Sequence, residues 1–166
     1  MKRVKMKIKF FSVGGTIDKI YFDALSRYEV GDSNIKDILQ NARVNFDYKI
    51  ESLLKKDSLD MTEQDRLIIL KAVQDEFNDK IIITHGTDTM IETAVALSSI
   101  KGKVIVLTGA MEPAKFKTSD AMFNLGFAVA AVQVLPAGVY LAISGRIFTP
   151  DNVQKNRAQK QFEEKM

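Results

Sequence analysis

Short apolar runs recur along the chain and are separated by segments with a helical pattern. From residue 6 onward apolar and charged residues alternate and then merge into an apolar run that ends at Val13, which predicts a strand. Residues 81–84 and 104–107 are wholly apolar or β-branched, as is typical of strands covered on both faces. The five predicted strands are residues 6–13, 44–50, 81–84, 104–107 and 139–143.

Helices are predicted between these strands. A short one around residues 35–39 has Asp32 or Ser33 as its cap, and a longer one covers residues 119–132. Thr62 with Asp65 has the form of a capping box that starts another helix. The residues expected on the buried face of that helix are Leu67, Leu70, Val73 and Phe77.

A further helix is predicted to begin near Thr89, with Glu92 completing a second capping box. The polar stretch at residues 18–32 has no clear period and is predicted to be a loop, long enough to suggest a functional role. Gly14 and Gly15 end the first strand, because two adjacent glycines permit a tight turn.

Strands thus alternate with helices about five times, with the most apolar strands in the middle. This order predicts an α/β fold, a three-layer open parallel sheet of the Rossmann or flavodoxin-like kind. The length of 166 residues predicts a single domain over residues 1–166. Ligands of such folds bind beyond the carboxyl ends of the strands, so the residues after each strand are the candidates for chemistry.

Composition removes several classes of function. The chain has no cysteine and one histidine, His85, which excludes a disulfide framework and ordinary zinc sites. No secretory or membrane-spanning segment is apparent, so we expect a cytoplasmic protein that binds no membrane. The small basic excess, 24 Lys and Arg against 21 Asp and Glu, argues against a nucleic-acid partner. It lies mostly in ends expected to be solvated: Lys2, Arg3, Lys5, Lys7, Lys9, Lys155, Arg157, Lys160 and Lys165.

Hydroxyl, carboxylate and ammonium groups converge at the predicted strand ends. Thr16 follows the first strand, Ser58 the second, Thr87 and Asp88 the third, and Lys155 the last. Such a set can supply a nucleophile, a base and a clamp for substrate. Each residue also has a plain structural interpretation: a threonine in a turn can bond its own backbone, and Lys155 lies in a polar tail.

Other chemistries fit the strand ends less well. His85 is expected to stabilise its turn rather than act as a base, since no Gly-x-Ser-x-Gly motif accompanies it. The glycines match neither the dinucleotide fingerprint nor the P-loop. A phosphoacceptor receiver domain would need acidic residues after the first strand, where Gly14-Gly15-Thr16 stands instead.

Three motifs together resemble the bacterial-type L-asparaginases, which hydrolyse the side-chain amide of L-asparagine to aspartate and ammonia. They are Gly14-Gly15-Thr16-Ile17, Thr84-His85-Gly86-Thr87-Asp88-Thr89 and Thr108-Gly109-Ala110-Met111, in this order and with Lys155 downstream. The resemblance covers nearly the whole chain but only the N-terminal domain of the family, so the family's smaller C-terminal domain is expected to be absent.

The resemblance implies a role for each site residue. Thr16 is the nucleophile that forms an acyl-enzyme, and Tyr28, in Tyr28-Glu29-Val30-Gly31, helps to take its proton. Tyr21 is the alternative tyrosine, because it lies in the same loop. Thr87, Asp88 and Lys155 form a second catalytic set, in which Lys155 accepts a proton from Thr87 or from the attacking water.

The substrate would be held by residues around this second set. By the resemblance, Asp88 binds the α-ammonium and Ser58 the α-carboxylate, while backbone N–H groups near Thr87 and Ala110 face the oxyanion. The family's Gln after the serine is Leu59 here, and its Arg-Pro after the alanine and methionine is Glu112-Pro113. No metal or organic cofactor is required.

Two other functions and the assembly state follow as expectations. The chain could instead be a non-catalytic module that keeps the fold and binds an amino acid or a partner chain. It could also be an amidohydrolase with another preference, such as glutamine. A half-length domain whose site is normally closed by a neighbour predicts a homo-oligomer, most simply a two-fold dimer.

Overall fold

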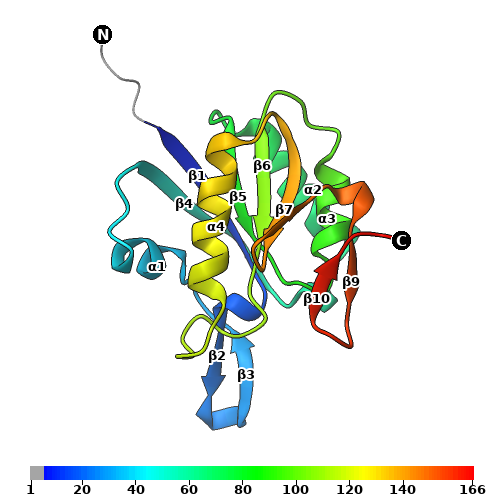
Figure 1. The fold of residues 1–166 in the computed structure, drawn as a ribbon. Coiled ribbons are helices and arrows are strands. Elements are labelled where there is room, and N and C mark those ends of the chain that lie inside the picture. The colour runs from blue at the N-terminus through cyan, green and yellow to red at the C-terminus, as the bar shows by residue number, and fades with distance from the viewer. Residues whose placement is uncertain (1–5) are drawn as a thin grey trace.

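The computed structural model describes residues 6–166 and centres on a six-stranded sheet with helices on both faces (Figure 1). The strand order is β4-β1-β5-β6-β7-β8, and every neighbouring pair is parallel except β7 with β8. The strands are β1 (Lys7–Gly14), β4 (Asp47–Lys56), β5 (Lys80–Thr84), β6 (Val104–Thr108), β7 (Gly138–Ile143) and β8 (Arg146–Phe148).

The helices form the two outer layers. Helices α2 (Glu63–Asp75) and α3 (Met90–Leu97) pack on one face of the sheet, and α1 (Ile35–Asn41) and α4 (Ala121–Val134) pack on the other. None of the helices in residues 6–166 is long and apolar enough to cross a membrane.

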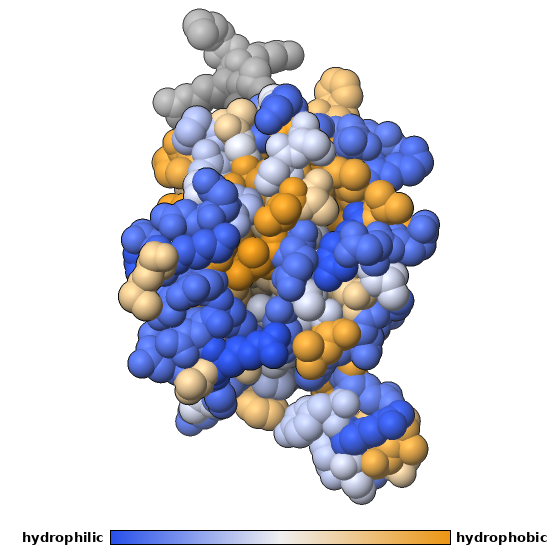
Figure 2. Space-filling view, turned by 90° about the vertical axis from the view of Figure 1, so that its right-hand side faces the viewer, coloured by the Kyte–Doolittle hydropathy of each residue, from blue (hydrophilic) through white to orange (hydrophobic). Residues whose placement is uncertain are grey.

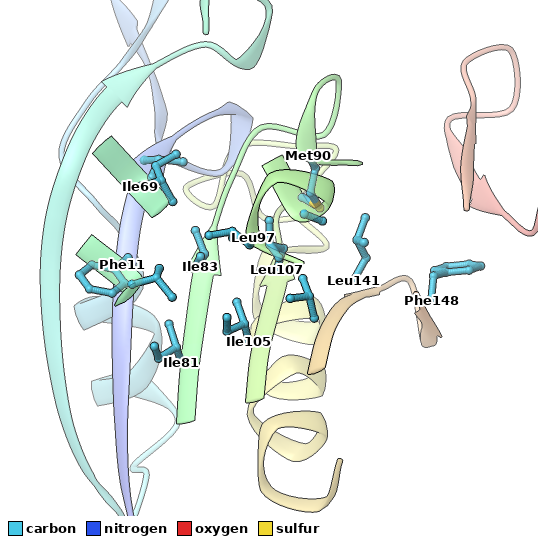
Figure 3. Close-up of a cluster of buried hydrophobic side chains, with 14 of the residues drawn as sticks. Phe11, Ile69, Ile81, Ile83, Met90, Leu97, Ile105, Leu107, Leu141 and Phe148 are labelled. Carbon is cyan, nitrogen blue, oxygen red and sulfur yellow. The ribbon is translucent and has the colours of Figure 1, made fainter. Parts of the chain in front are cut away.

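Successive side chains along the central strands point to opposite faces of the sheet, so they contribute to the hydrophobic clusters under both helix layers. Phe11, Ile83 and Leu107 belong to the cluster under α2 and α3, and Figure 3 shows them on the same side of three adjacent strands. Their neighbours Phe10 and Ile82 belong to the cluster under α1 and α4. Strands buried on both faces have to be apolar throughout, which is why these runs are recognisable in the sequence.

The predicted α/β open sheet is confirmed, with one antiparallel strand added at its edge. The five parallel strands follow the flavodoxin-like order 2-1-3-4-5, so the strand order reverses between β1 and β5. Ligands of open α/β sheets bind at this switch point, beyond the carboxyl ends of the strands. The turns after β1 and β5 are therefore where this fold is expected to bind a ligand.

The segment predicted as a loop at residues 18–32 is instead largely a β-hairpin. Strands β2 (Lys19–Phe22) and β3 (Arg27–Val30) pair antiparallel around the 3-10 turn Asp23–Leu25. The hairpin projects beyond the body of the sheet, where it has no layer to alternate against (Figure 1). A second small hairpin, β9 (Gln154–Asn156) with β10 (Gln161–Glu163), lies near the C-terminus.

The predicted buried face of α2 is confirmed at Val73, which is fully buried, and at Leu70, which is partly buried against the core, but it is wrong at Leu67 and Phe77. Leu67 is 54% exposed, and Phe77 lies beyond the helix end and is fully exposed. The buried residues of the helix are Asp65, Arg66, Ile69 and Val73. Burial of polar Asp65 and Arg66 explains the error, because a search for apolar residues passes over them.

Of the predicted helix caps, one is confirmed, one has the predicted N-cap residue but no capping box, and one is wrong. The Thr62 hydroxyl accepts a hydrogen bond from Asp65 N at 3.2 Å, and Thr62 N donates to Asp65 at 2.8 Å, which is the expected capping box. Thr89 is the N-cap residue of α3, as predicted, but its side chain forms no capping box and donates instead to the Ser58 carbonyl at 2.7 Å. The N-cap of α1 is Asn34, not Asp32 or Ser33.

The expected solvation of the basic ends fails for two lysines. Lys9 is buried in β1 and forms ion pairs with Glu51 at 2.6 Å and Glu76 at 3.2 Å. Lys155 lies in β9 with its side chain 13% exposed. Lys2, Arg3 and Lys5 lie outside the described residues.

Candidate active site

The turn after β1 presents Thr16 at the carboxyl edge of the sheet. Gly15 has φ +91°, a conformation that side chains disfavour, and its N–H donates to the Lys56 carbonyl at 2.9 Å. A Cβ on Gly15 would lie 2.4 Å from the Gly86 nitrogen. The turn that carries Thr16 is therefore pressed directly against the turn that carries Thr87, and glycine is required for this contact.

Asp18 anchors the chain just after Thr16. Its buried carboxylate accepts hydrogen bonds from Asn34 N at 2.8 Å and from the Ser12 hydroxyl at 3.2 Å. Burial raises the pKa of this carboxyl, and the hydrogen bonds from Asn34 and Ser12 act in the opposite direction. Asp18 was not predicted as a site residue, because an acidic residue in a loop is ordinarily solvated.

Three side chains predicted to act together meet in the structure. The Lys155 ammonium donates to the Thr87 hydroxyl at 2.8 Å and to the Asp88 carboxylate at 2.7 Å, across 68 and 67 residues of chain. Thr87 is buried, and the Asp88 side chain is 32% exposed. A threonine oxygen held against a lysine and a carboxylate is an arrangement in which a proton can be moved to or from a hydroxyl.

Ser58 adjoins this set from the turn after β4. Its buried hydroxyl oxygen accepts from Asp88 N at 3.2 Å, which leaves the hydroxyl hydrogen available to a ligand. A Cβ on Gly86 would lie 2.5 Å from the Ser58 side chain. Close packing of bare backbone against Ser58 thus fixes the distance between the two turns.

An ion pair joins the Thr16 segment to the Ser58 turn. Lys19 contacts Asp57 at 2.5 Å, and the Asp57 side chain also accepts from Leu59 N at 3.2 Å. Burial alone would raise the pKa of Asp57, but the Lys19 and Leu59 hydrogen bonds, with the charges of Lys19 and Lys155, lower it. Neither Lys19 nor Asp57 was predicted, since charged residues near strand ends are common.

The predicted loop tyrosines lie on the hairpin. Tyr28 and Tyr21 are 49% and 52% exposed, with ring centroids 5.4 Å apart, and Tyr28 also contacts Phe116 at 5.9 Å. Tyr28 lines an open pocket of about 560 Å³ together with Lys19 and Asp57. Figure 2 shows the hairpin as a lobe below the body of the molecule, with hydrophobic side chains on its surface.

Ala110 follows β6 and is buried. The next two backbone N–H groups, of Met111 and Glu112, donate to the Asp120 carboxylate at 3.0 and 3.1 Å, so this loop is held in place by its own acidic residue. Within residues 6–166 no group of three His, Cys, Asp or Glu side chains converges in a way that could hold a metal ion.

His85 is fully buried and its side chain is hydrogen-bonded to the turn after β5. Its Nδ1 lies 2.7 Å from the Gly86 carbonyl, which can only accept, so Nδ1 carries the proton; Nε2 then accepts from the Thr93 hydroxyl at 2.8 Å. Burial lowers the pKa of His85 to about 4. This geometry agrees with the prediction that His85 stabilises its turn.

The neutral state of His85 predicts a pH-dependent stability. Unfolded chains bind a proton on histidine near pH 6.5, whereas folded His85 resists it until about pH 4, so stability falls as pH drops through this range. The cost reaches about 3 kcal/mol in the free energy of unfolding. His85 is the only histidine, so one ring resonance in NMR reports its protonation directly. A midpoint near pH 6.5 in the folded protein would contradict the assignment.

Comparison of the chain with known proteins identifies similar families and relatives. A family model described as "Asparaginase, N-terminal" matches residues 7–163. The chain is 36% identical over 162 residues to an L-asparaginase from Thermococcus kodakarensis, covering 90% of this chain and 48% of that protein. It is 33% identical over 159 residues to a probable periplasmic L-asparaginase from Haemophilus influenzae, covering 89% and 46%.

Solved structures agree with the sequence comparisons. The thermostable L-asparaginase from Thermococcus kodakarensis matches with a TM-score of 0.80 at 31% identity, covering 96% of this chain and 51% of that one. A probable cytoplasmic L-asparaginase from Campylobacter jejuni matches with a TM-score of 0.80 at 30% identity, covering 96% and 52%. The chain thus spans about half the length of the relatives it matches.

Proposed function

Because the chain belongs to the asparaginase family, whose N-terminal domain it matches over residues 7–163, we propose that it hydrolyses L-asparagine to L-aspartate and ammonia. The family membership confirms the resemblance that the three motifs predicted. The observation that carries the proposal is the contact of Lys155 with both Thr87 and Asp88 at the switch point of the sheet.

The first half of the proposed reaction transfers the acyl group to Thr16. The Thr16 oxygen attacks the side-chain carbonyl carbon, an ester bond forms, and the carbon–nitrogen bond of the amide breaks. The proton that Thr16 loses leaves with the nitrogen as ammonia. Tyr28 on the hairpin relays this proton, with Tyr21 as the alternative; a hydroxyl needs such a partner because it is a weak nucleophile at neutral pH.

The second half hydrolyses the ester. Water attacks the acyl carbon, the bond to Thr16 breaks, and aspartate leaves, while the proton that the water loses ends on the Thr16 oxygen and restores its hydroxyl. Lys155, held by hydrogen bonds to Thr87 and Asp88, passes protons between Thr87 and the attacking water. Backbone N–H groups near Thr87 and Ala110 face the oxyanion in both halves, since donors aimed at developing charge lower the barrier.

The zwitterionic end of the substrate suits the remaining groups. Asp88 has one carboxylate oxygen on Lys155, and its other oxygen is assigned to the α-ammonium of asparagine. The free hydroxyl hydrogen of Ser58 is assigned to the α-carboxylate. This division uses one anion for the cation and one donor for the anion, and no metal or organic cofactor is needed.

Location, domain organisation and assembly belong to the same proposal. We assign residues 1–166 as one catalytic domain of the asparaginase type that acts in the cytoplasm as a homo-oligomer. The names of relatives support either compartment, since one is called periplasmic and another cytoplasmic. Neither nucleic acid nor membrane is a proposed partner.

Ammonia release from L-asparagine, L-glutamine and their D-forms by the purified protein tests the proposal. We expect turnover of L-asparagine to exceed that of the other three, and Thr16→Ala to remove it. Thermal unfolding with each amino acid is measured in parallel, because a ligand that binds the native state raises the melting temperature without turnover.

The outcomes separate the alternatives. Stabilisation by asparagine with no ammonia under any condition would replace the enzyme by a binding module. A preference for L-glutamine would change the substrate but keep the reaction. Equal ammonia release by wild type and Thr16→Ala would end the proposed mechanism.

A further inference from the structure

A groove separate from the strand ends lies between α1 and the loop that joins β6 to α4. One wall comes from residues 34–41 and the other from residues 114–122, on the face of the sheet that carries α4 (Figure 1). Its volume is about 460 Å³, within the range of roughly 300–1,000 Å³ that small-molecule sites occupy. None of the residues that we assign to hydrolysis lines it, so it is a second cavity that the proposed reaction does not use.

Both walls of this groove are attached to the same backbone carbonyl. The Ile17 oxygen accepts a hydrogen bond from Ala114 N at 3.0 Å and another from the Asn34 side-chain nitrogen at 3.3 Å. Ala114 and the buried Asn34 belong to opposite walls. Phe116, on the same wall as Ala114, also contacts the Tyr28 ring at 5.9 Å. The groove is therefore held at a set width before a ligand arrives, which lowers the cost of ordering it on binding.

The charged side chains of the groove have no partner in the described part of the chain. Asp37 comes from α1, and Lys115 and Lys117 come from the loop. Within residues 6–166 none of these three, nor the Asn41 amide, forms a hydrogen bond or ion pair with another residue. The open pocket beside Tyr28 differs, because each of its four cations has a carboxylate partner: Lys19 with Asp57, Arg27 with Glu29, Lys55 with Asp32 and Lys56 with Asp65.

We propose that this groove binds an amino acid that carries two carboxylates, aspartate or glutamate. The α-ammonium pairs with Asp37, and the two carboxylates pair with Lys115 and Lys117. The Asn41 amide can donate to a remaining carboxylate oxygen, and the carbon chain lies on apolar Ile38. One anion and two cations in the groove thus meet one cation and two anions in the ligand.

The count of charges makes the groove selective. Asparagine has one carboxylate and leaves one lysine without a partner, whereas succinate has no ammonium and sets a carboxylate beside Asp37. We expect each to bind about tenfold more weakly than aspartate, the change that follows the loss of one hydrogen bond between charged groups. Asp37, Lys115 and Lys117 are exposed, so the affinity for aspartate should be modest and should fall as salt is added.

NMR titration of the isotope-labelled protein tests the site. Aspartate and glutamate are titrated separately, and the one that binds more tightly is the ligand. Either should shift the backbone amides of residues 37–41 and 115–117, while residues 87 and 88 report the strand ends independently. Lys115→Gln with Lys117→Gln should remove the shifts in the groove and leave any at the strand ends. Lys36→Gln with Lys101→Gln is the matched control, because both lysines are exposed and lie outside the groove; it should bind like wild type.

Asp37→Asn gives the decisive result. Loss of its carboxylate should weaken aspartate binding about tenfold and should not weaken succinate binding, so the preference for aspartate over succinate disappears. Misfolding could not produce so selective a change. The proposal would be overturned by an absence of groove shifts with both aspartate and glutamate, by equal affinity for aspartate and asparagine, by lost binding in the control, or by a preference over succinate that survives Asp37→Asn. These readouts need no turnover, so they are independent of asparagine hydrolysis.

Discussion

Lys155→Met is expected to lower ammonia release from L-asparagine by about a thousandfold, the range typical of losing a proton-transfer group. Methionine keeps most of the length of the side chain but removes the ammonium that contacts Thr87 at 2.8 Å and Asp88 at 2.7 Å. Asp88 is then left without its cation, and Thr87 without the partner that holds its oxygen. The steady-state rate at saturating asparagine is the measurement.

A matched variant distinguishes this effect from a general change of charge. Lys71 forms an exposed pair with Asp75 on α2 at 2.9 Å, so Lys71→Met removes one lysine from an ion pair far from the strand ends. We expect its activity to equal that of wild type, because exposed pairs contribute little. Activity above a tenth of wild type in a folded Lys155→Met protein would contradict the role given to Lys155.

Gly15→Ala is expected to have the largest effect on stability. The added methyl group would enter a left-handed backbone position at φ +91° and would lie 2.4 Å from the Gly86 nitrogen. Strain at one such residue costs about 1–3 kcal/mol, and the collision with backbone adds to it because neither turn can rotate away. We expect urea unfolding to show a loss of at least about 3 kcal/mol.

Gly102→Ala separates the cost of backbone strain from the cost of the collision with neighbouring backbone. Gly102 also has a positive φ, +76°, but a Cβ there meets nothing within 4 Å. Its cost should therefore be the backbone strain alone, about 1–2 kcal/mol. Equal losses in the two variants would show that the contact between the Thr16 turn and the Thr87 turn does not constrain the site. Gly15→Ala should also lose asparagine turnover, since it forces these turns apart.

The sequence was most informative for strands that are covered on both faces and for backbone positions that few residue types can occupy. Phe11, Ile83 and Leu107 lie in runs that only a covered strand tolerates, and these runs located the central strands. Gly15 could be recognised as a turn residue, although its contact with Gly86 could not. Thr16 and Lys155 gained their roles from a resemblance rather than from spacing, because a threonine in a turn and a lysine in a polar tail have ordinary explanations.

Charged and exposed residues account for most of what the sequence could not predict. Lys9 looked solvated, but Glu51 and Glu76 come from distant segments to pair with it in the sheet. Glu92 was the expected local partner of Thr89, but the Thr89 hydroxyl donates to the carbonyl of Ser58 instead. The hairpin that bears Tyr28 has no buried face, so its sequence shows no regular alternation of apolar and polar residues. For Lys9 and Thr89 a contact distant in sequence overrides the local pattern, whereas the hairpin has no local pattern to detect.

The central claim is that Thr16 carries the acyl group during hydrolysis of L-asparagine. Rapid acid quench of the working enzyme, followed by mass spectrometry of its peptides, tests this claim directly. The account predicts that the peptide containing Thr16 gains the mass of one aspartyl group. The same gain should be absent from Thr16→Ala and should accumulate in Lys155→Met, in which the ester is hydrolysed slowly. An aspartyl group on Thr87, or turnover with no group on either threonine, would contradict it.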